Sequence, residues 1–365
     1  MATEDKTKDS PEGFSIGRLW RALSVPIVSV LLALLIGAIL LWISGASPIE
    51  AYQALFKGSF GSMKAFGRTL EKSTPLILGG LAVAFAFKAG LFNIGGQGQL
   101  LVGAITAAYV GFAVDGLPFI IHMPLALFAG SIAGGLYAAI AGALKTYTGA
   151  HEVITTIMLN YIAINLTDYL ANGPWKAEGI IARTPPVLET AVIPIWGYIP
   201  LGFFIAVFMA FFTWYLLERT TWGFEIKTTG LNAHAAKYAG IKVPLVIIMT
   251  MGFSGFLAGM GGAIETLGVV GRYQPGFNAG LGFDGITIAL LAKTHPLGVI
   301  PAAILVGAMQ AGSSQMQFDA GVPFQIIDVI QALMLFFVSA DVIVRWLLGR
   351  RGEESESVSL GSGWA

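Results

Sequence analysis

Three amide side chains lie close together between two long apolar runs of the sequence. Asn93, Gln97 and Gln99 occur within residues 88–99 beside four glycines, and the runs at 75–87 and 100–114 are largely apolar. Amides offer hydrogen-bond donors and acceptors without charge. Broken backbone at membrane depth is tolerated only where it is buried in protein or lines a wet cavity. We interpret this Gly-rich segment as polar lining for a neutral solute, the alternative being that the amides only tie helices together.

A second polar series recurs every four residues. Glu152, Thr156 and Asn160 therefore fall near one face of a helix, with Asn160 well inside an apolar stretch. Glu152 stands where the helix begins, and a carboxylate is favourable there. Glu152 is thus either a helix-start charge or a candidate gate or contact to another subunit.

Two further segments carry polar groups. Asp284 opens a short apolar stretch after Gly282 and Phe283, where it either caps the helix or marks a functional site near the membrane. In the polar segment 218–243, Asn232 is expected to cap a short helix that ends at Gly240. A helix this short is unstable alone in water, so we expect it to dock on a cytoplasmic partner, the alternative being an idle surface helix.

Composition sets the class of protein. Of 365 residues, 55% are hydrophobic and 12% charged, the net charge is zero and there is no cysteine. Soluble domains contain about 25% charged residues, so we predict an all-α polytopic membrane protein. Nothing indicates a nucleic-acid partner, a disulfide framework or a thiolate metal site. There is no Walker A loop, nucleophile elbow or metal motif, so the chain is not expected to be an enzyme or to bind a cofactor or metal.

Apolar stretches predict about ten spans, at residues 24–44, 73–87, 97–114, 119–144, 152–171, 199–217, 244–267, 283–292, 297–315 and 324–348. The domain prediction is a polar tail at 1–21, a membrane region at 22–348 that includes the loop 218–243, and a tail at 349–365. About two thirds of the 21 Lys and Arg then share a side with both termini, which predicts cytoplasmic termini. A missed span near 45–72 or 268–292 would change this assignment.

Four segments, 90–99, 151–161, 230–241 and 282–286, resemble in order the nucleoside-type permeases of ABC importers, relatives of ribose and branched-chain amino-acid permeases. The resemblance implies an ABC importer permease fold in a bacterial inner membrane, paired with a second permease subunit. It also implies ABC ATPase subunits that use ATP and Mg, and a periplasmic or lipid-anchored solute-binding protein. The small-molecule solute is then most simply a nucleoside.

The resemblance assigns roles to particular residues. The substrate path is expected to include Phe92, Asn93, Gln97, Gln99, Asn160, Phe283 and Asp284. Coupling to the ATPase is expected to involve Gly230, Asn232, Ala235, Ala236 and Gly240.

Other functions remain open at this point. A ribose-like sugar or a branched-chain amino acid is the alternative solute. An ion-driven secondary transporter needs acids at depth, and Asp168, Glu265 and Asp284 all stand near the ends of spans. An intramembrane enzyme needs a catalytic pair at depth, and none is evident.

Overall fold

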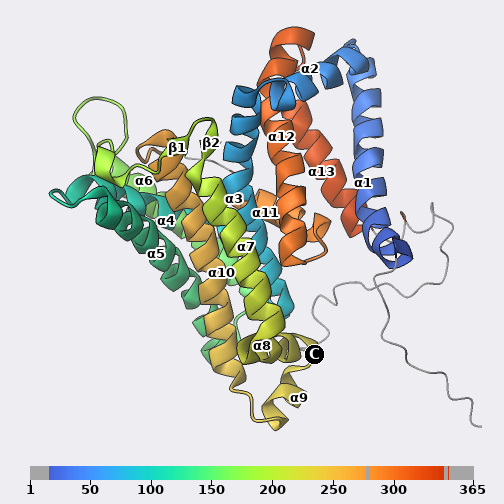
Figure 1. Ribbon diagram of the computed structural model, residues 1–365. Coiled ribbons are helices and arrows are strands. Elements are labelled where there is room, and N and C mark those ends of the chain that lie inside the picture. The colour runs from blue at the N-terminus through green and yellow to red at the C-terminus, as the bar shows by residue number, and fades with distance from the viewer. Residues whose placement is uncertain (1–15, 277–279, 341–343, 345–365) are drawn as a thin grey trace, which may run out of the picture.

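The computed structural model describes residues 16–276, 280–340 and 344. Residues 1–15 and 349–365, the greater part of the two predicted tails, lie outside them. Within the described residues the secondary structure is helical apart from one two-stranded hairpin (Figure 1). The elements are α1 (Ile16–Ile43), α2 (Pro48–Phe60), α3 (Met63–Lys88), α4 (Gly96–Ala113), α5 (Phe119–Thr148), α6 (Glu152–Asn172), η1 (Glu189–Ala191), β1 (Ile195–Trp196), β2 (Ile199–Pro200), α7 (Leu201–Arg219), α8 (Thr221–Leu231), α9 (Ala233–Tyr238), α10 (Val243–Glu265), η2 (Thr266–Val270), α11 (Leu281–Leu291), α12 (Pro296–Ala320) and α13 (Gln325–Ser339).

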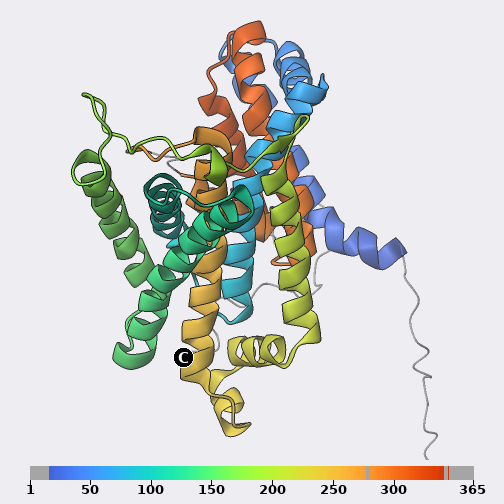
Figure 2. The same ribbon diagram turned by 60° about the vertical axis from the view of Figure 1, so that its left-hand side comes forward.

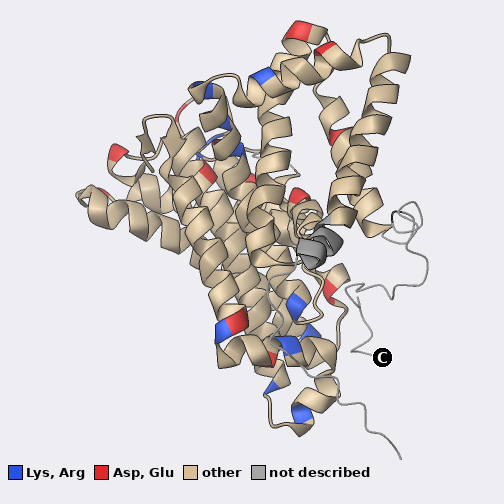
Figure 3. Ribbon diagram, turned by 45° about the vertical axis from the view of Figure 1, so that its right-hand side comes forward, with Lys and Arg blue, Asp and Glu red and all other residues tan. Residues whose placement is uncertain are grey.

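The helices confirm a polytopic membrane protein. Seven of the described helical segments are long and apolar enough to cross a bilayer; they correspond to α1, α3, α5, α6, α7, α12 and the continuous α10–η2. The three other predicted spans correspond to α4, which opens with Gly96-Gln97-Gly98-Gln99, and to the shorter apolar helices α11 and α13. Figure 3 shows Lys and Arg gathered toward the two ends of the helix bundle, with few charges in the band between them.

Helix α3 is central to the packing. It contacts α7, α10, α11 and α12, and from Ser73 to Phe87 every residue is buried. On the other side of α10 lie α4 and α5, where small residues allow close packing of the backbones. Helices α1, α2 and α13 form a separate apolar cluster with the far end of α12 (Figure 1).

Three segments contain more helix than their composition predicts. The segment 45–72 lies between the first two predicted spans. It contains α2, whose Ser47 cap accepts from Glu50 N, and the first turns of α3, whose Ser62 cap accepts from Ala65 N. The segment 218–243 contains α8 as well as the predicted short helix. Helix α1 begins at Ile16, so residues 16–21 of the predicted tail are helical.

Candidate functional site

Asn93 and Gln99 pair through their side-chain amides. Asn93 Nδ2 donates to Gln99 Oε1 and Gln99 Nε2 donates to Asn93 Oδ1, both at 2.9 Å. Asn93 also donates to Ser254 Oγ at 2.8 Å and accepts from Gly95 N at 2.9 Å, and Ser254 donates to the Ala82 carbonyl at 2.6 Å. All three side chains are buried. The network therefore fixes the Gly-rich segment to α3 and α10.

Asn160 and Gln97 attach two more helices to the same segment. Asn160 Oδ1 accepts from Gly98 N at 2.8 Å, and its Nδ2 donates to the Ile94 carbonyl at 2.9 Å. Gln97 Oε1 accepts from Gly282 N at 2.9 Å. The structure therefore brings the four predicted amides onto one buried segment where α3, α4, α6, α10 and α11 meet. In this conformation the hydrogen bonds described above go to protein groups, so the role of the amides in a solute path stays a prediction.

The first residues of α4 and α11 lie against each other. A Cβ atom on Gly282 would overlap the backbone of Gly96 and Gln97, so the close approach requires glycine. Helix N-termini carry partial positive charge, and half-helices that end inside a membrane protein are a common way to build a solute site. Two such ends meet here.

The two predicted aromatic residues flank this junction. Phe283, on the first turn of α11, is 44% exposed. Its neighbour Asp284 accepts from Gln310 Nε2 on α12 at 3.0 Å. Phe92 is half-buried and lies edge-to-face with Phe87, with ring centroids 4.7 Å apart. Phe283 is therefore the most accessible of the predicted path residues.

Glu152 connects the Gly-rich segment to α5. Its Oε2 lies 2.7 Å from Lys145 Nζ, and its Oε1 accepts from Phe92 N at 3.4 Å. The Glu152 side chain is 7% exposed and that of Lys145 is 13% exposed. The ion pair is thus largely shielded from water, which strengthens the attraction between the two charges. Through its contact with Phe92 N, Glu152 also holds the start of the Gly-rich segment in place.

The expected short helix is present at one end of the bundle, beyond α8 (Figures 1 and 2). Asn232 Oδ1 accepts from Ala235 N at 2.9 Å, and α9 ends before Gly240, whose φ is +85°. Within α9, Ala236 is buried on the inner side of the helix, whereas Ala235 is exposed. The six residues of α9 thus present Ala235 on their outer surface.

Gly230, on the last turn of α8, lies directly against the turn that precedes the amide network. A Cβ atom at Gly230 would overlap the Lys88 carbonyl oxygen and the backbone of Ala89 and Gly90. Helix α8 also packs on α3, α7, α9 and α10. The chain therefore has a contiguous contact from α9 through α8 to the Gly-rich segment.

Three supporting residues were missed from the sequence. Ser254 lies within the apolar run of α10 and bonds to Asn93, 161 residues away. Gln310 binds Asp284 from α12, and Lys145 pairs with Glu152. Only the spacing of seven residues between Lys145 and Glu152 could have indicated a local pair, because the other two contacts depend on tertiary structure.

Comparison with known proteins identifies a protein family and several similar permeases. Residues 66–339 match the family described as branched-chain amino acid transport system / permease component. The chain is 40% identical over 338 residues to a guanosine ABC transporter permease protein of Bacillus subtilis, covering 90% of this chain and 96% of that protein. It is 33% identical to a nucleoside ABC transporter permease protein of Lactococcus lactis (90% and 93% covered) and 33% identical to a glucose ABC transporter permease protein of Haloferax volcanii (94% and 95% covered).

Proposed function

The chain belongs to the family of branched-chain amino acid transport system permease components, and we propose that the solute it carries is a nucleoside. It is a permease subunit of an ABC importer and forms part of a membrane path. The observation that supports a nucleoside is the 40% identity, over nine tenths of the chain, to a permease named for guanosine. The exposed Phe283 ring beside Asp284 suits such a solute, because aromatic rings stack on nucleobases and a carboxylate accepts hydrogen bonds from base or ribose.

A hexose is the second candidate. The permease of Haloferax volcanii named for glucose is 33% identical over 94% of this chain, the same identity as the Lactococcus nucleoside permease. A sugar would also use amide and carboxylate hydrogen bonds, but it has no flat ring to stack on Phe283.

The energy comes from partner subunits in this proposal. Two ABC ATPases bind ATP and Mg on the cytoplasmic side of the permease pair. A solute-binding protein delivers the nucleoside from the opposite side of the membrane. This chain pairs with a second permease and binds no nucleotide itself. The segment that meets the ATPase consists of Gly230, Asn232, Ala235, Ala236 and Gly240, because α9 lies at the end of the bundle (Figure 1), packs on α8 through its buried side and presents Ala235 outward.

Movement of the ATPase reaches the path through direct contacts. Displacement of α9 moves α8, and Gly230 transmits it to the backbone at 88–90. That turn leads into the amide network, where the side chains of Asn93 and Gln99 are hydrogen-bonded to each other. The Asn160 side chain is hydrogen-bonded to the backbone of the same segment. Opening the network exposes Asn93, Gln97, Gln99 and Asn160 to the solute, with Phe92, Phe283 and Asp284 completing the path. Glu152 holds the Gly-rich segment through Phe92 N and is itself held by the ion pair with Lys145 on α5. In this proposal Glu152 thereby stabilises the closed state of the path.

The orientation follows from charge. The end that carries α8 and α9 faces the cytoplasm in this proposal, as do both termini, because the predicted spans put about two thirds of the Lys and Arg on that side. The membrane is the bacterial inner membrane, where ATP is available on this side.

Uptake by the intact complex tests the solute. The chain is purified from its native membrane with its associated subunits and reconstituted with the binding protein. Uptake of labelled guanosine is then measured in competition with other nucleosides and with glucose. Nucleosides should compete and glucose should not; the reverse result would favour the hexose.

A further inference from the structure

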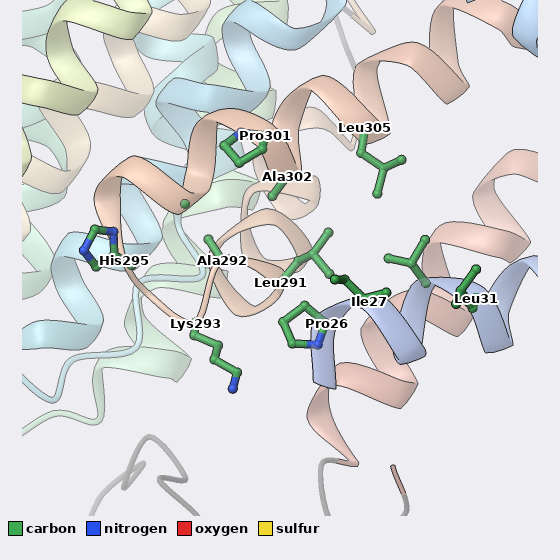
Figure 4. A pocket seen from close by; sticks show the side chains of 12 residues that line it. Pro26, Ile27, Leu31, Leu291, Ala292, Lys293, His295, Pro301, Ala302 and Leu305 are labelled. Carbon is green, nitrogen blue, oxygen red and sulfur yellow. The ribbon is translucent and has the colours of Figure 1, made fainter. Parts of the chain in front are cut away.

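A groove of about 640 Å³ separates α1 from the turn between α11 and α12 (Figure 4). Its volume is in the range of small-molecule sites, about 300–1,000 Å³. It lies on the side of the molecule away from the α4–α5 pair, and α1 packs mainly on α13 and α2. Its lining residues are Pro26, Ile27, Val30, Leu31, Leu291, Ala292, Lys293, His295, Gly298, Pro301, Ala302 and Leu305.

The groove is apolar along most of its length and polar at one end. Lys293 and His295 lie toward one end, and Leu31 and Leu305 lie toward the other (Figure 4). Ordered water in an apolar groove beside a membrane span lacks hydrogen-bond partners, which costs free energy. We therefore expect an apolar chain to fill the groove. The shape and the lining therefore fit one extended hydrocarbon chain with a polar head at the Lys293 end.

The polar end has a positive character. The side chain of Lys293 is exposed, and the charge of Lys88 also acts on His295. Burial and the Lys88 charge lower the pKa of His295 below its usual value, and the Glu218 carboxylate acts in the opposite direction. Helix α12 starts at Pro296 without a side-chain cap, and Gly298 in its first turn lines the groove. Lysine and helix N–H groups together suit a phosphate.

The turn at this end is held in an unusual backbone conformation. Lys293 and Thr294 have φ values of +50° and +57°, the left-handed region that residues with a side chain rarely adopt. The Thr294 N–H donates to the Ala289 carbonyl at 2.8 Å, and the residue is buried. The tertiary structure thus fixes the turn, which keeps Lys293 at the rim of the groove.

We propose that this groove binds an anionic phospholipid, with an acyl chain between α1 and α12 and the phosphate beside Lys293 and the start of α12. The site is separate from the solute path. Helix α12 runs from this turn to α2, which lies at the end of the bundle opposite α8 (Figure 1), so the polar end faces the same side of the membrane as α8. Under the orientation proposed above this is the cytoplasmic leaflet, whose anionic lipids attract lysine.

A site-specific fluorescence measurement tests the proposal. The chain has no cysteine, so Ala302→Cys gives a single thiol for a bimane label inside the groove; Ala302 is 7% exposed. The labelled full complex is placed in nanodiscs that contain phosphatidylglycerol or phosphatidylcholine with the same brominated acyl chain, which quenches on contact. Leu136→Cys on α5, at a 67% exposed site outside the groove, is the matched control, and Leu305→Cys is a second reporter should Ala302→Cys fail to assemble.

The expected result is quenching at Ala302→Cys with an about fivefold preference for phosphatidylglycerol, because one lysine near an anionic lipid contributes about 1 kcal/mol. The preference should be absent at Leu136→Cys and should be lost at Ala302→Cys when Lys293→Gln is added. Equal quenching by the two lipids at Ala302→Cys would overturn the headgroup assignment. Absence of quenching by either lipid would show that protein, such as a terminal segment or the second permease, fills the groove. Neither outcome depends on which solute is transported.

Discussion

Gly230 lies against the carbonyl oxygen of Lys88 so closely that no side chain fits between them. The contact joins the last turn of α8 to the turn that leads into the amide network of Asn93 and Gln99. It is the point where the proposed ATPase-facing segment meets the proposed solute path.

Gly230→Val should uncouple the importer. Inserting a branched side chain against backbone costs about 1–3 kcal/mol or displaces α8 from the turn at 88–90. Uptake should fall steeply while the ATPase subunits still co-purify with the permease. Gly252→Ala on α10 is the control, because its new Cβ would meet its nearest atom at an ordinary 3.7 Å. Normal uptake by Gly230→Val would remove this contact from the coupling route.

Asn160→Leu should reduce uptake and stability together. It leaves Gly98 N and the Ile94 carbonyl without their side-chain partner, and each buried polar group left unpaired costs about 1–3 kcal/mol. Thermal unfolding of the purified complex and solute uptake measure the two effects. Asn165→Leu on the same helix is the matched control, because Asn165 is exposed and its amide bonds only within its own helix, to the Tyr161 carbonyl. Equal behaviour of the two variants would argue against a special role for Asn160.

Lys145→Met should destabilise the fold more than the double variant Lys145→Met/Glu152→Gln. The single change leaves the buried Glu152 carboxylate without its partner at 2.7 Å, a loss of about 3–5 kcal/mol for a buried pair. Removing the charge of Glu152 as well should restore part of this stability. Lys227→Met breaks the exposed pair with Glu218 and should cost less than about 1 kcal/mol. Thermal unfolding of the four proteins gives the comparison.

Phe283→Leu should weaken the transport of a nucleoside. A stacked base contributes about 1–3 kcal/mol through its contact with an aromatic ring, so the KM for a nucleoside should rise while the ATPase remains associated. Phe318→Leu, at an 85% exposed position on α12, should leave the KM unchanged. An unchanged KM for guanosine in Phe283→Leu would place the stacking surface elsewhere.

Local sequence signals predicted the parts of this molecule that depend on neighbouring residues. The break between α3 and α4 followed from glycines and amides at 88–99, and the cap at Asn232 followed from its position before a short helical segment. The face that joins Glu152 to Asn160 followed from the spacing of four. Both side chains are buried, and each contacts the Gly-rich segment.

Contacts between distant segments could not be predicted in the same way. Ser254 is one hydroxyl in an apolar helix, and nothing nearby indicates that it binds Asn93. The polar segment 220–231 was expected to be part of a loop because its apolar residues are few. It folds as α8 since Gly223, Ile226 and Thr229 are buried against the bundle. Whether this segment forms a helix or a loop thus depends on its burial in the tertiary structure, which composition alone does not predict.

The most direct test of the account is photo-cross-linking from the outer surface of α9. Ala235→Cys gives this chain a single thiol at an exposed position, which is labelled with a benzophenone in native membranes, and only the cross-linked products that contain this chain are isolated and identified by mass spectrometry. The account predicts an ABC ATPase subunit attached at this position and none attached at the control Phe318→Cys. A product without an ATPase at Ala235→Cys, or the ATPase attached at Phe318→Cys, would contradict the proposed coupling.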